Sequence, residues 1–274
     1  MRARQRWLHW SDGGTCLPWL PESSMKHLVR TSLVSALMLA GLSAPAWARA
    51  PAAASASDAG GWQSLFNGRS LAGWHSYNMK GAASGWSVVD GAIHLQRTPD
   101  SKLEQVQDLI TDASYQNFDL KLEWKMSPCA DAGVMFNVHE DPKYTYTFET
   151  GVEMQIADLA CTVPDSRVLY ERAGDMFDLY AAPYESVRAA GQWNQIEIRV
   201  DHGHVQFLQN GKKTVDTHLW TAAWKQRVAK TKFATWPGFA KYHQGHISLQ
   251  GTENKGRAGQ PIQLWFRHIR IKRL

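Results

Sequence analysis

Cysteine is scarce in this sequence. It occurs three times in 274 residues, and never in a CxxC pair or a Cys/His cluster. The usual zinc-binding motifs are therefore excluded. Cys129 and Cys161 remain as an even pair once the N-terminal export signal described below is removed. In an oxidising compartment they could form a disulfide, and two separately buried thiols are the alternative. The sequence requires no cofactor, and a divalent cation stays an open alternative.

Long hydrophobic runs are also missing. The apolar run Leu33–Leu42 is far shorter than the roughly 20 residues that cross a bilayer. It follows the basic residues Lys26 and Arg30 and precedes a small-x-small cleavage site at 46–48. This order is typical of a signal peptide, which we place at 25–48. The sequence thus predicts no transmembrane segment, and export to the periplasm or the cell surface.

The rest of the chain divides by composition. We interpret residues 1–24 as upstream sequence translated from an early start codon. Residues 49–60 are rich in Ala, Ser and Pro, as expected of a flexible linker. We expect residues 61–274 to fold as a single domain, a normal size for one β-sandwich or barrel.

A clustered basic face is absent as well. The net charge is +5, and five basic residues against two acidic ones lie in the first 48 residues. Elsewhere Lys and Arg are interspersed with acids, which argues against nucleic acid as a partner.

Alternation of apolar and polar residues with a period of two is the dominant pattern. In 118–126 one set of alternate residues is apolar and the other is charged, and 193–200 repeats the pattern. Turn signals at 201–204 and at Asn210-Gly211 separate the strands that follow. Helical periodicity is restricted to 221–229. The sequence therefore predicts an all-β, antiparallel jelly-roll sandwich with one short surface helix.

Ten short segments, in order, resemble the 3-keto-disaccharide hydrolase family. The first reads LFNGRSLAGW, like the LFNGxxLxGW opening of that family. The segments are 65–74, 86–91, 118–124, 151–155, 191–194, 210–211, 232–233, 236–239, 245–250 and 265–267.

The resemblance implies a concanavalin A-like jelly roll whose concave sheet holds the site. It also implies a substrate, an oligosaccharide or glycoside oxidised at C3 of the sugar. A ketone at C3 acidifies the proton on C2, so a base can remove it and the aglycone can leave C1 before water adds. Such an enzyme needs a base and an enolate stabiliser.

Glu153 and Gln155 alternate with apolar residues and therefore project from one face of a strand. We predict that this face is the site, with Glu153 as a base and Gln155 as a binding residue. An ordinary retaining glycosidase of the laminarinase type would carry a carboxylate at position 155, so the glutamine disfavours that mechanism.

Four other residues are candidates for the chemistry. Glu123 and Lys125 share a strand face and would lie beside Glu153 if their strands were neighbours. His246 is the alternative base, because it exchanges protons near neutral pH. Arg267 or Lys125 would stabilise the enolate. For each, a structural ion pair or hydrogen bond is the alternative.

The remaining candidates bind substrate. Trp265 projects with Arg267, and Gln250 shares the face of His246. Asn137 stands where the family has a basic residue. Asp158 is a weaker candidate, expected to form hydrogen bonds at a strand end.

The chain also departs from the family pattern. Asp131 opens a segment that is usually Asn-Ser-Gly, and Gly251-Thr252-Glu253 replaces a usual Asp-His-Gly. If the absent histidine is a base or a metal ligand in relatives, substrate choice would change or catalysis would be lost. A non-catalytic carbohydrate-binding module on the same fold is therefore the alternative function.

Overall fold

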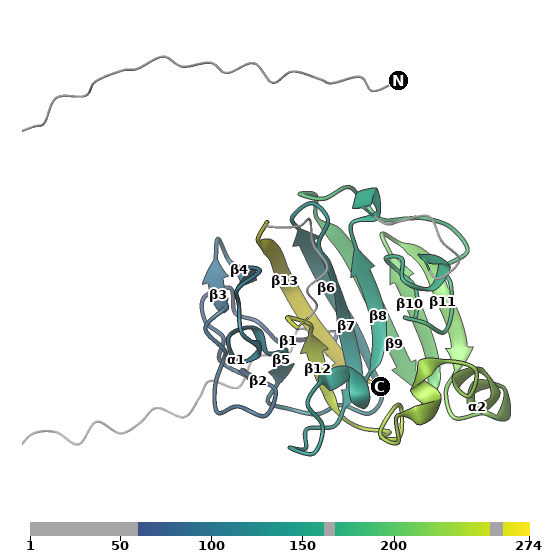
Figure 1. The fold of residues 1–274 in the computed structure, drawn as a ribbon. Helices are drawn as coiled ribbons and strands as arrows, with labels where there is room; N and C mark the ends of the chain where they lie inside the picture. The colour runs from purple at the N-terminus through teal and green to yellow at the C-terminus, as the bar shows by residue number, and fades with distance from the viewer. Residues whose placement is uncertain (1–59, 162–167, 253–259) are drawn as a thin grey trace, which may run out of the picture. The chain divides into compact units, whose positions relative to one another are not determined.

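A computed structural model describes residues 60–161, 168–252 and 260–274. In this part of the chain two antiparallel sheets lie one behind the other (Figure 1). Their facing sides share one hydrophobic cluster. The predicted all-β, antiparallel jelly-roll sandwich is thus confirmed.

The larger sheet contains eight strands, in the order β11-β10-β9-β6-β13-β4-β3, with β1 also pairing with β13. Its strands are β1 (Gln63–Ser64), β3 (Trp86–Val89), β4 (Ala92–Arg97), β6 (Phe118–Met126), β9 (Asn194–Asp201), β10 (His204–Gln209), β11 (Lys212–His218) and β13 (Ile262–Arg273).

The smaller sheet contains five strands, in the order β2-β5-β12-β7-β8. They are β2 (Trp74–Ser76), β5 (Leu109–Thr111), β7 (Asp131–Val138), β8 (Val152–Ala157) and β12 (His246–Leu249). The chain forms β9, β10 and β11 in the larger sheet before it returns to the smaller one as β12. This crossing places β12 between β5 and β7, although it is distant from both in sequence.

Strand alternation decides which side chains enter the core. On β6 the side chains from Phe118 to Met126 that face inward are at most 2% exposed. On β8, Val152, Met154 and Ile156 are fully buried in the same cluster. Each such side chain contributes roughly 1.5–3 kcal/mol of hydrophobic stabilisation. The intervening residues of both strands therefore lie on the outer faces of the sandwich.

The two predicted tight turns form as expected. His202 and Gly203 join β9 to β10 with φ angles of 50° and 86°, and Asn210 and Gly211 join β10 to β11 with φ angles of 49° and 78°. Positive φ at both central residues matches the right-handed twist of the flanking strands.

The outer edge of β8 is not open. The backbone N–H of Gly174 donates to the carbonyl of Gln155, and that of Gln155 donates to the carbonyl of Asp175. Phe177 also donates its N–H to the carbonyl of Glu153. The segment 174–177 thus covers the edge of the smaller sheet and holds Phe177 next to it.

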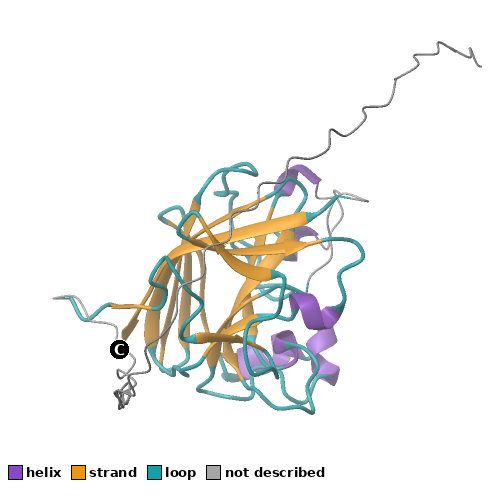
Figure 2. Cartoon of the chain, turned by 90° about the vertical axis from the view of Figure 1, so that its left-hand side faces the viewer, coloured by secondary structure: helices purple, strands orange, loops and turns teal. Residues whose placement is uncertain are grey.

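Helical segments lie outside the strand layers (Figure 2). The predicted surface helix is α2 (Ala222–Val228), and its N-cap Thr221 accepts a hydrogen bond from the N–H of Trp224. A second helix, α1 (Leu103–Val106), was not expected, because a single turn is too short to show periodicity. The 3-10 turns are η1 (Thr147–Glu149), η2 (Leu159–Cys161), η3 (Val168–Tyr170) and η4 (Lys232–Thr235).

Some predictions concern residues outside the described part of the chain. The upstream segment 1–24, the signal peptide 25–48 and the linker up to residue 59 are among them. Cys129 is disulfide-bonded, and the side chain of Cys161, its expected partner, also lies outside the described residues. None of the helices in the described residues is long and apolar enough to cross a membrane.

Candidate active site

A cavity of about 240 Å³ lies on the outer face of the smaller sheet. Strand β8 and the end of β12 supply its polar residues, while η1, η4 and the segment around residue 177 supply aromatic ones. The lining residues are Phe148, Gly151, Glu153, Gln155, Phe177, Lys232, Phe233, Trp236, Phe239 and Gln250.

Glu153 is the carboxylate of this cavity. Its strand neighbours point into the core, so its own side chain points outward, and it is 9% exposed. The carboxylate lies over Gly133 of the adjacent strand β7, where any Cβ atom would collide with it. Gly133 has no positive φ angle, so the close approach of Glu153 is what requires glycine here.

Two amide side chains accompany the carboxylate. Gln155 is 2% exposed, and its Nε2 donates a hydrogen bond to Oδ1 of Asp131. Gln250 is 5% exposed, and its backbone N–H donates to the carbonyl of Gly133 over 3.0 Å. The structure thus brings together Glu153, Gln155 and Gln250, three of the predicted site residues.

Aromatic rings and one ammonium group also line the cavity. The rings of Phe233 and Phe239 stack with 3.8 Å between centroids, and Trp236 lies edge-on at 5.1 Å from Phe233. Lys232 places its Nζ 4.2 Å from the centroid of Phe177. Apolar ring faces of this kind suit the C–H face of a sugar.

Sequence reasoning did not assign a role to Lys232 or to these rings. The segments 232–233 and 236–239 are among the ten that resemble the family. That resemblance is the signal in the sequence that could have identified these residues. Their position over the smaller sheet is a tertiary fact, since they belong to the connection between α2 and β12.

A buried carboxylate fixes the segment that follows β12. Oδ1 of Asp108 accepts hydrogen bonds from the N–H groups of Gly251 and Thr252, over 2.8 and 3.0 Å. Its other oxygen accepts a hydrogen bond from the Thr147 hydroxyl, next to Phe148 of the cavity. Burial raises the pKa of Asp108. Sequence reasoning missed this residue. Glu253, the last residue of the divergent loop, lies outside the described residues.

Four predicted site residues lie on the other side of the molecule. Glu123, Lys125, Trp265 and Arg267 belong to β6 and β13, and they project from the outer face of the larger sheet. The expectation that Glu123 and Lys125 would lie beside Glu153 is wrong, because β6 and β8 are in different sheets. Alternation shows which residues share a face, but not which strands become neighbours.

These residues contact one another, and Glu123 also lines a hollow of about 620 Å³ on the larger sheet, which lacks the aromatic cluster of the smaller cavity. Nε of Arg267 lies 2.7 Å from Oε2 of Glu123. Burial of Glu123 opposes ionisation, but hydrogen bonds from Arg267, His268 and Gln195 outweigh it and lower the pKa of its carboxyl. Lys125 lies over the ring of Trp265, 4.6 Å from its centroid. An ion pair, the structural alternative, thus describes Glu123 and Arg267, whereas Lys125 contacts the rings of Trp193 and Trp265.

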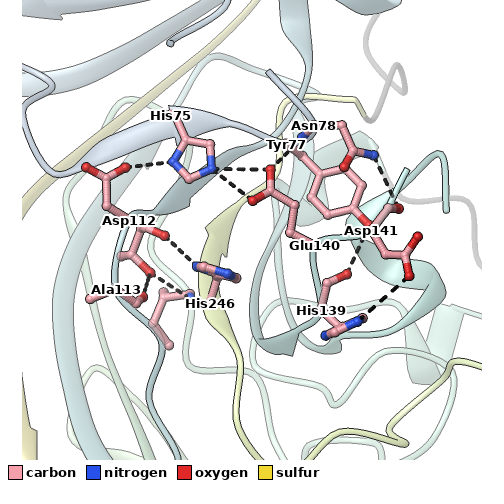
Figure 3. A network of polar contacts seen from close by, with 11 residues as sticks. His75, Tyr77, Asn78, Asp112, Ala113, His139, Glu140, Asp141 and His246 are labelled. Carbon is pink, nitrogen blue, oxygen red and sulfur yellow. Dashed lines mark hydrogen bonds and ion pairs between the residues drawn. The ribbon is translucent and has the colours of Figure 1, made fainter. Parts of the chain in front are cut away.

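His246 and Asn137 also lie away from the cavity lining. Nδ1 of His246 donates to the carbonyl of Thr111 over 2.6 Å, at the far end of β12 (Figure 3). Asn137 is fully buried with a φ angle of 56° next to a bulge in the pairing of β7 with β12. The side-chain nitrogen and oxygen of Asn137 have no hydrogen-bond partner in the described residues.

Asp158 has the strand-end role that was expected of it. Its carboxylate accepts hydrogen bonds from the N–H groups of Cys129 and Ala160, over 2.8 and 3.3 Å. It therefore fixes the turn before β7 and is not part of the cavity lining.

A second polar network connects the ends of three strands of the smaller sheet. His75 on β2 lies between Asp112, 2.6 Å from Nδ1, and Glu140, 3.2 Å from Nε2 (Figure 3). Burial of the ring opposes its charge, but the hydrogen bonds to both carboxylates outweigh this and raise the pKa of His75. Across residues 60–161, 168–252 and 260–274, no group of three or more His, Cys, Asp or Glu side chains is placed to hold a metal ion.

Comparison with known proteins identifies relatives of this chain and of its fold. The family model described as the 3-keto-alpha-glucoside-1,2-lyase-like domain matches residues 61–272. A 3-keto-disaccharide hydrolase of Bacteroides thetaiotaomicron is 26% identical over 242 residues, which cover 78% of this chain and 79% of that protein.

Two solved structures, both of proposed glycosyl hydrolases from Parabacteroides distasonis, are also similar. One is 26% identical with a TM-score of 0.68, over 80% of this chain and 96% of that one. The other is 26% identical with a TM-score of 0.54, over 78% of this chain and 99% of that one. Together these matches confirm the resemblance found in the sequence.

Proposed function

Because the chain belongs to the 3-keto-alpha-glucoside-1,2-lyase-like family, we propose that it is a hydrolase that cleaves 3-keto-glycosides, including 3-keto-disaccharides, in the cavity of the smaller sheet. The observation that carries this proposal is the position of Glu153. Its carboxylate lies in a small cavity that two amides, an ammonium group and aromatic rings also line. This arrangement supplies a base, a positive charge and an apolar platform for one sugar ring.

Glu153 is the base in this mechanism. The ketone at C3 makes the C2 proton acidic, and the carboxylate takes that proton while the C–H electron pair forms the enolate. A positioned general base of this kind typically contributes about 10²- to 10⁴-fold to the rate. No second carboxylate at a fixed distance is needed, in contrast to ordinary glycosidases.

Lys232 is the enolate stabiliser. It is the cationic side chain among the described lining residues, and it replaces Arg267 and Lys125 in this role because those two project from the larger sheet. A positive charge near the developing enolate oxygen stabilises it. Gln155 and Gln250 hydrogen-bond to sugar oxygens and hold C2 near the base.

Collapse of the enolate restores the C3 carbonyl, forms a C1=C2 double bond and breaks the bond between C1 and the aglycone oxygen. Protonated Glu153 returns its proton to the departing oxygen. Water then adds across the double bond, with its oxygen on C1 and a proton on C2. The net reaction is hydrolysis of the glycosidic bond.

Incubation with paired substrates tests the proposal. Purified protein should release the aglycone from 3-keto-trehalose and 3-keto-glucosides, and it should leave trehalose and ordinary glucosides intact. In D₂O the sugar product should carry deuterium at C2, because water adds to a double bond. Equal rates on oxidised and unoxidised sugars, or product without deuterium, would contradict the mechanism.

A carbohydrate-binding module is the second candidate function. The observation in its favour is Gly251-Thr252, where the family pattern has an Asp and a His. Saturable binding of the 3-keto sugars without any release of aglycone would identify the protein as a module.

We also propose that the mature protein acts in the periplasm or at the cell surface. Support comes from the basic start, apolar run and cleavage site within residues 25–48. N-terminal sequencing of the protein from a periplasmic fraction should give a chain that begins near Arg49. An intact chain that starts at Met1 in that fraction would contradict this proposal.

A further inference from the structure

Only one of the two polar atoms of the Gln155 side-chain amide forms a hydrogen bond in the described residues. Its Nε2 donates to Asp131, whereas the buried Oε1 accepts no hydrogen bond in the described residues. The backbone of Gln155 is fixed as well, through hydrogen bonds with Gly174 and Asp175. A buried acceptor without a donor costs about 1–3 kcal/mol. A bound molecule that donates a hydrogen bond would remove this cost.

Asp131 determines which end of the amide faces its neighbour. The strand register pairs Gln155 with Gly133, so Asp131, two residues earlier on β7, is the diagonal neighbour on the same face. A carboxylate accepts hydrogen bonds and donates none. The amide must therefore turn its NH₂ group toward Asp131, which leaves its oxygen for the ligand.

We propose that Asp131 is a specificity-determining positioning residue, which orients Gln155 so that the cavity accepts a hydroxyl group of the sugar and disfavours an acceptor-only group at that place. The sugar class rests on the proposed function. A hydroxyl donates to Oε1, whereas a carbonyl oxygen or a fluorine at the same place is repelled by it. The ketone of the substrate therefore binds elsewhere in the cavity, on the side of Lys232.

Binding measurements test this orientation without turnover. The probes are methyl 3-keto-glucoside and its analogues with a single hydroxyl replaced by fluorine, titrated against the Glu153→Gln variant. One fluoro analogue should bind on the order of tenfold to a hundredfold more weakly than the parent sugar, because a hydrogen bond is lost at a buried acceptor. At the other positions the fluoro and hydroxyl compounds should differ less.

The Asp131→Asn substitution should remove that preference. Asparagine has the same shape but can donate or accept, so the amide of Gln155 is free to turn. In the Glu153→Gln background, the sensitive fluoro analogue should then have a dissociation constant at most about threefold that of the parent sugar. The melting temperature should be unchanged. Gln155→Met, which removes Oε1, should abolish the same preference. Asp216→Asn on β11 of the larger sheet is the matched control and should leave every ratio unchanged.

The two proposals can fail separately. Turnover of the parent sugar by the unmodified protein tests the hydrolase function, whereas the ratios of dissociation constants test the role of Asp131. A preference that survives Asp131→Asn, a panel without any sensitive position, or no binding by any sugar would overturn the inference. Loss of the preference without turnover in the unmodified protein would support it and reject the hydrolase.

Discussion

A single carboxylate, that of Glu153, is the base of the proposed chemistry. Glu153 is 9% exposed, so a substrate has to enter the cavity to reach it. Its strand position also means that the side chain packs against a backbone glycine and not among core side chains. Chemistry and folding therefore depend on this residue to different degrees.

Exchange of Glu153 for Gln should reduce turnover by about 10²- to 10⁴-fold, because the general base is lost. The shape of the side chain is unchanged, and we expect the stability to change by about half a kcal/mol. Rates and melting curves from one preparation measure both effects. Glu123→Gln, on the opposite outer face, is the control and should keep full turnover. A Glu153→Gln variant with normal turnover would exclude it as the base.

Gly133 is predicted to act through Glu153. An added Cβ would displace the carboxylate, and a misplacement of about 1 Å commonly costs around 10²-fold in rate. Gly133→Ala should therefore lose turnover but melt close to the unmodified protein, since its backbone suits any residue. Gly211→Ala should do the opposite. Its φ of 78° makes alanine unfavourable by about 1–2 kcal/mol, far from the cavity. Normal turnover in Gly133→Ala would contradict the prediction that Gly133 fixes the position of Glu153 for catalysis.

At the scale of elements, hydrogen bonds between strand ends hold the smaller sheet together away from the cavity. His75 on β2 contacts Asp112, next to β5, and Glu140, beyond β7. β2 pairs with β5 but not with β7, because β5 and β12 lie between them in the sheet. The His75 ring thus connects parts that the strand ladder leaves separate.

The stability of the fold should depend on pH through His75. Its pKa is raised above the ordinary value of 6.5, so the folded state binds the proton more tightly than the unfolded chain. The stabilisation is complete below the unfolded pKa and is lost as the pH rises through the folded one.

Denaturant unfolding of the unmodified protein and of His75→Gln, at several pH values from about 6 upward, measures this effect. The difference in free energy of unfolding should shrink as the pH rises. His202→Gln is the control, because the His202 side chain is 82% exposed whereas that of His75 is 19% exposed. Parallel pH profiles for the unmodified protein and His75→Gln would contradict the prediction.

At the scale of the whole molecule, the hydrophobic core separates two polar surfaces. One holds the cavity with Glu153 and Lys232, and the other holds the ion pair of Glu123 with Arg267. A rigid, close-packed core of this kind leaves no direct contact between the two outer faces.

Two matched substitutions should show which of these surfaces holds the chemistry. Lys232→Met should reduce turnover strongly, because the positive charge at the enolate is lost. Arg267→Met should leave turnover unchanged and cost at most about 1 kcal/mol of stability, as is usual for a partly exposed ion pair. Rates and unfolding curves for both variants provide the measurement. Reduced turnover in Arg267→Met with normal turnover in Lys232→Met would place the chemistry on the larger sheet.

The sequence by itself determined several of the strands and their inward faces. Alternation at 118–126 and 193–200 and the turn signals at 201–204 and 210–211 are local signals, because each depends on neighbours within a few positions. The same alternation put Glu153 and Gln155 on one face. Ordered motif matches along residues 65–267 were sufficient to identify the family.

Only the tertiary structure decided which strands share a sheet. Glu123 and Glu153 have the same local pattern, yet β6 entered the larger sheet and β8 the smaller one. The cavity likewise required Lys232, Phe233 and Trp236 to fold back over β8 from the connection before β12. Strand pairing between distant segments follows from the packing of the whole core, and no local pattern in the chain encodes it.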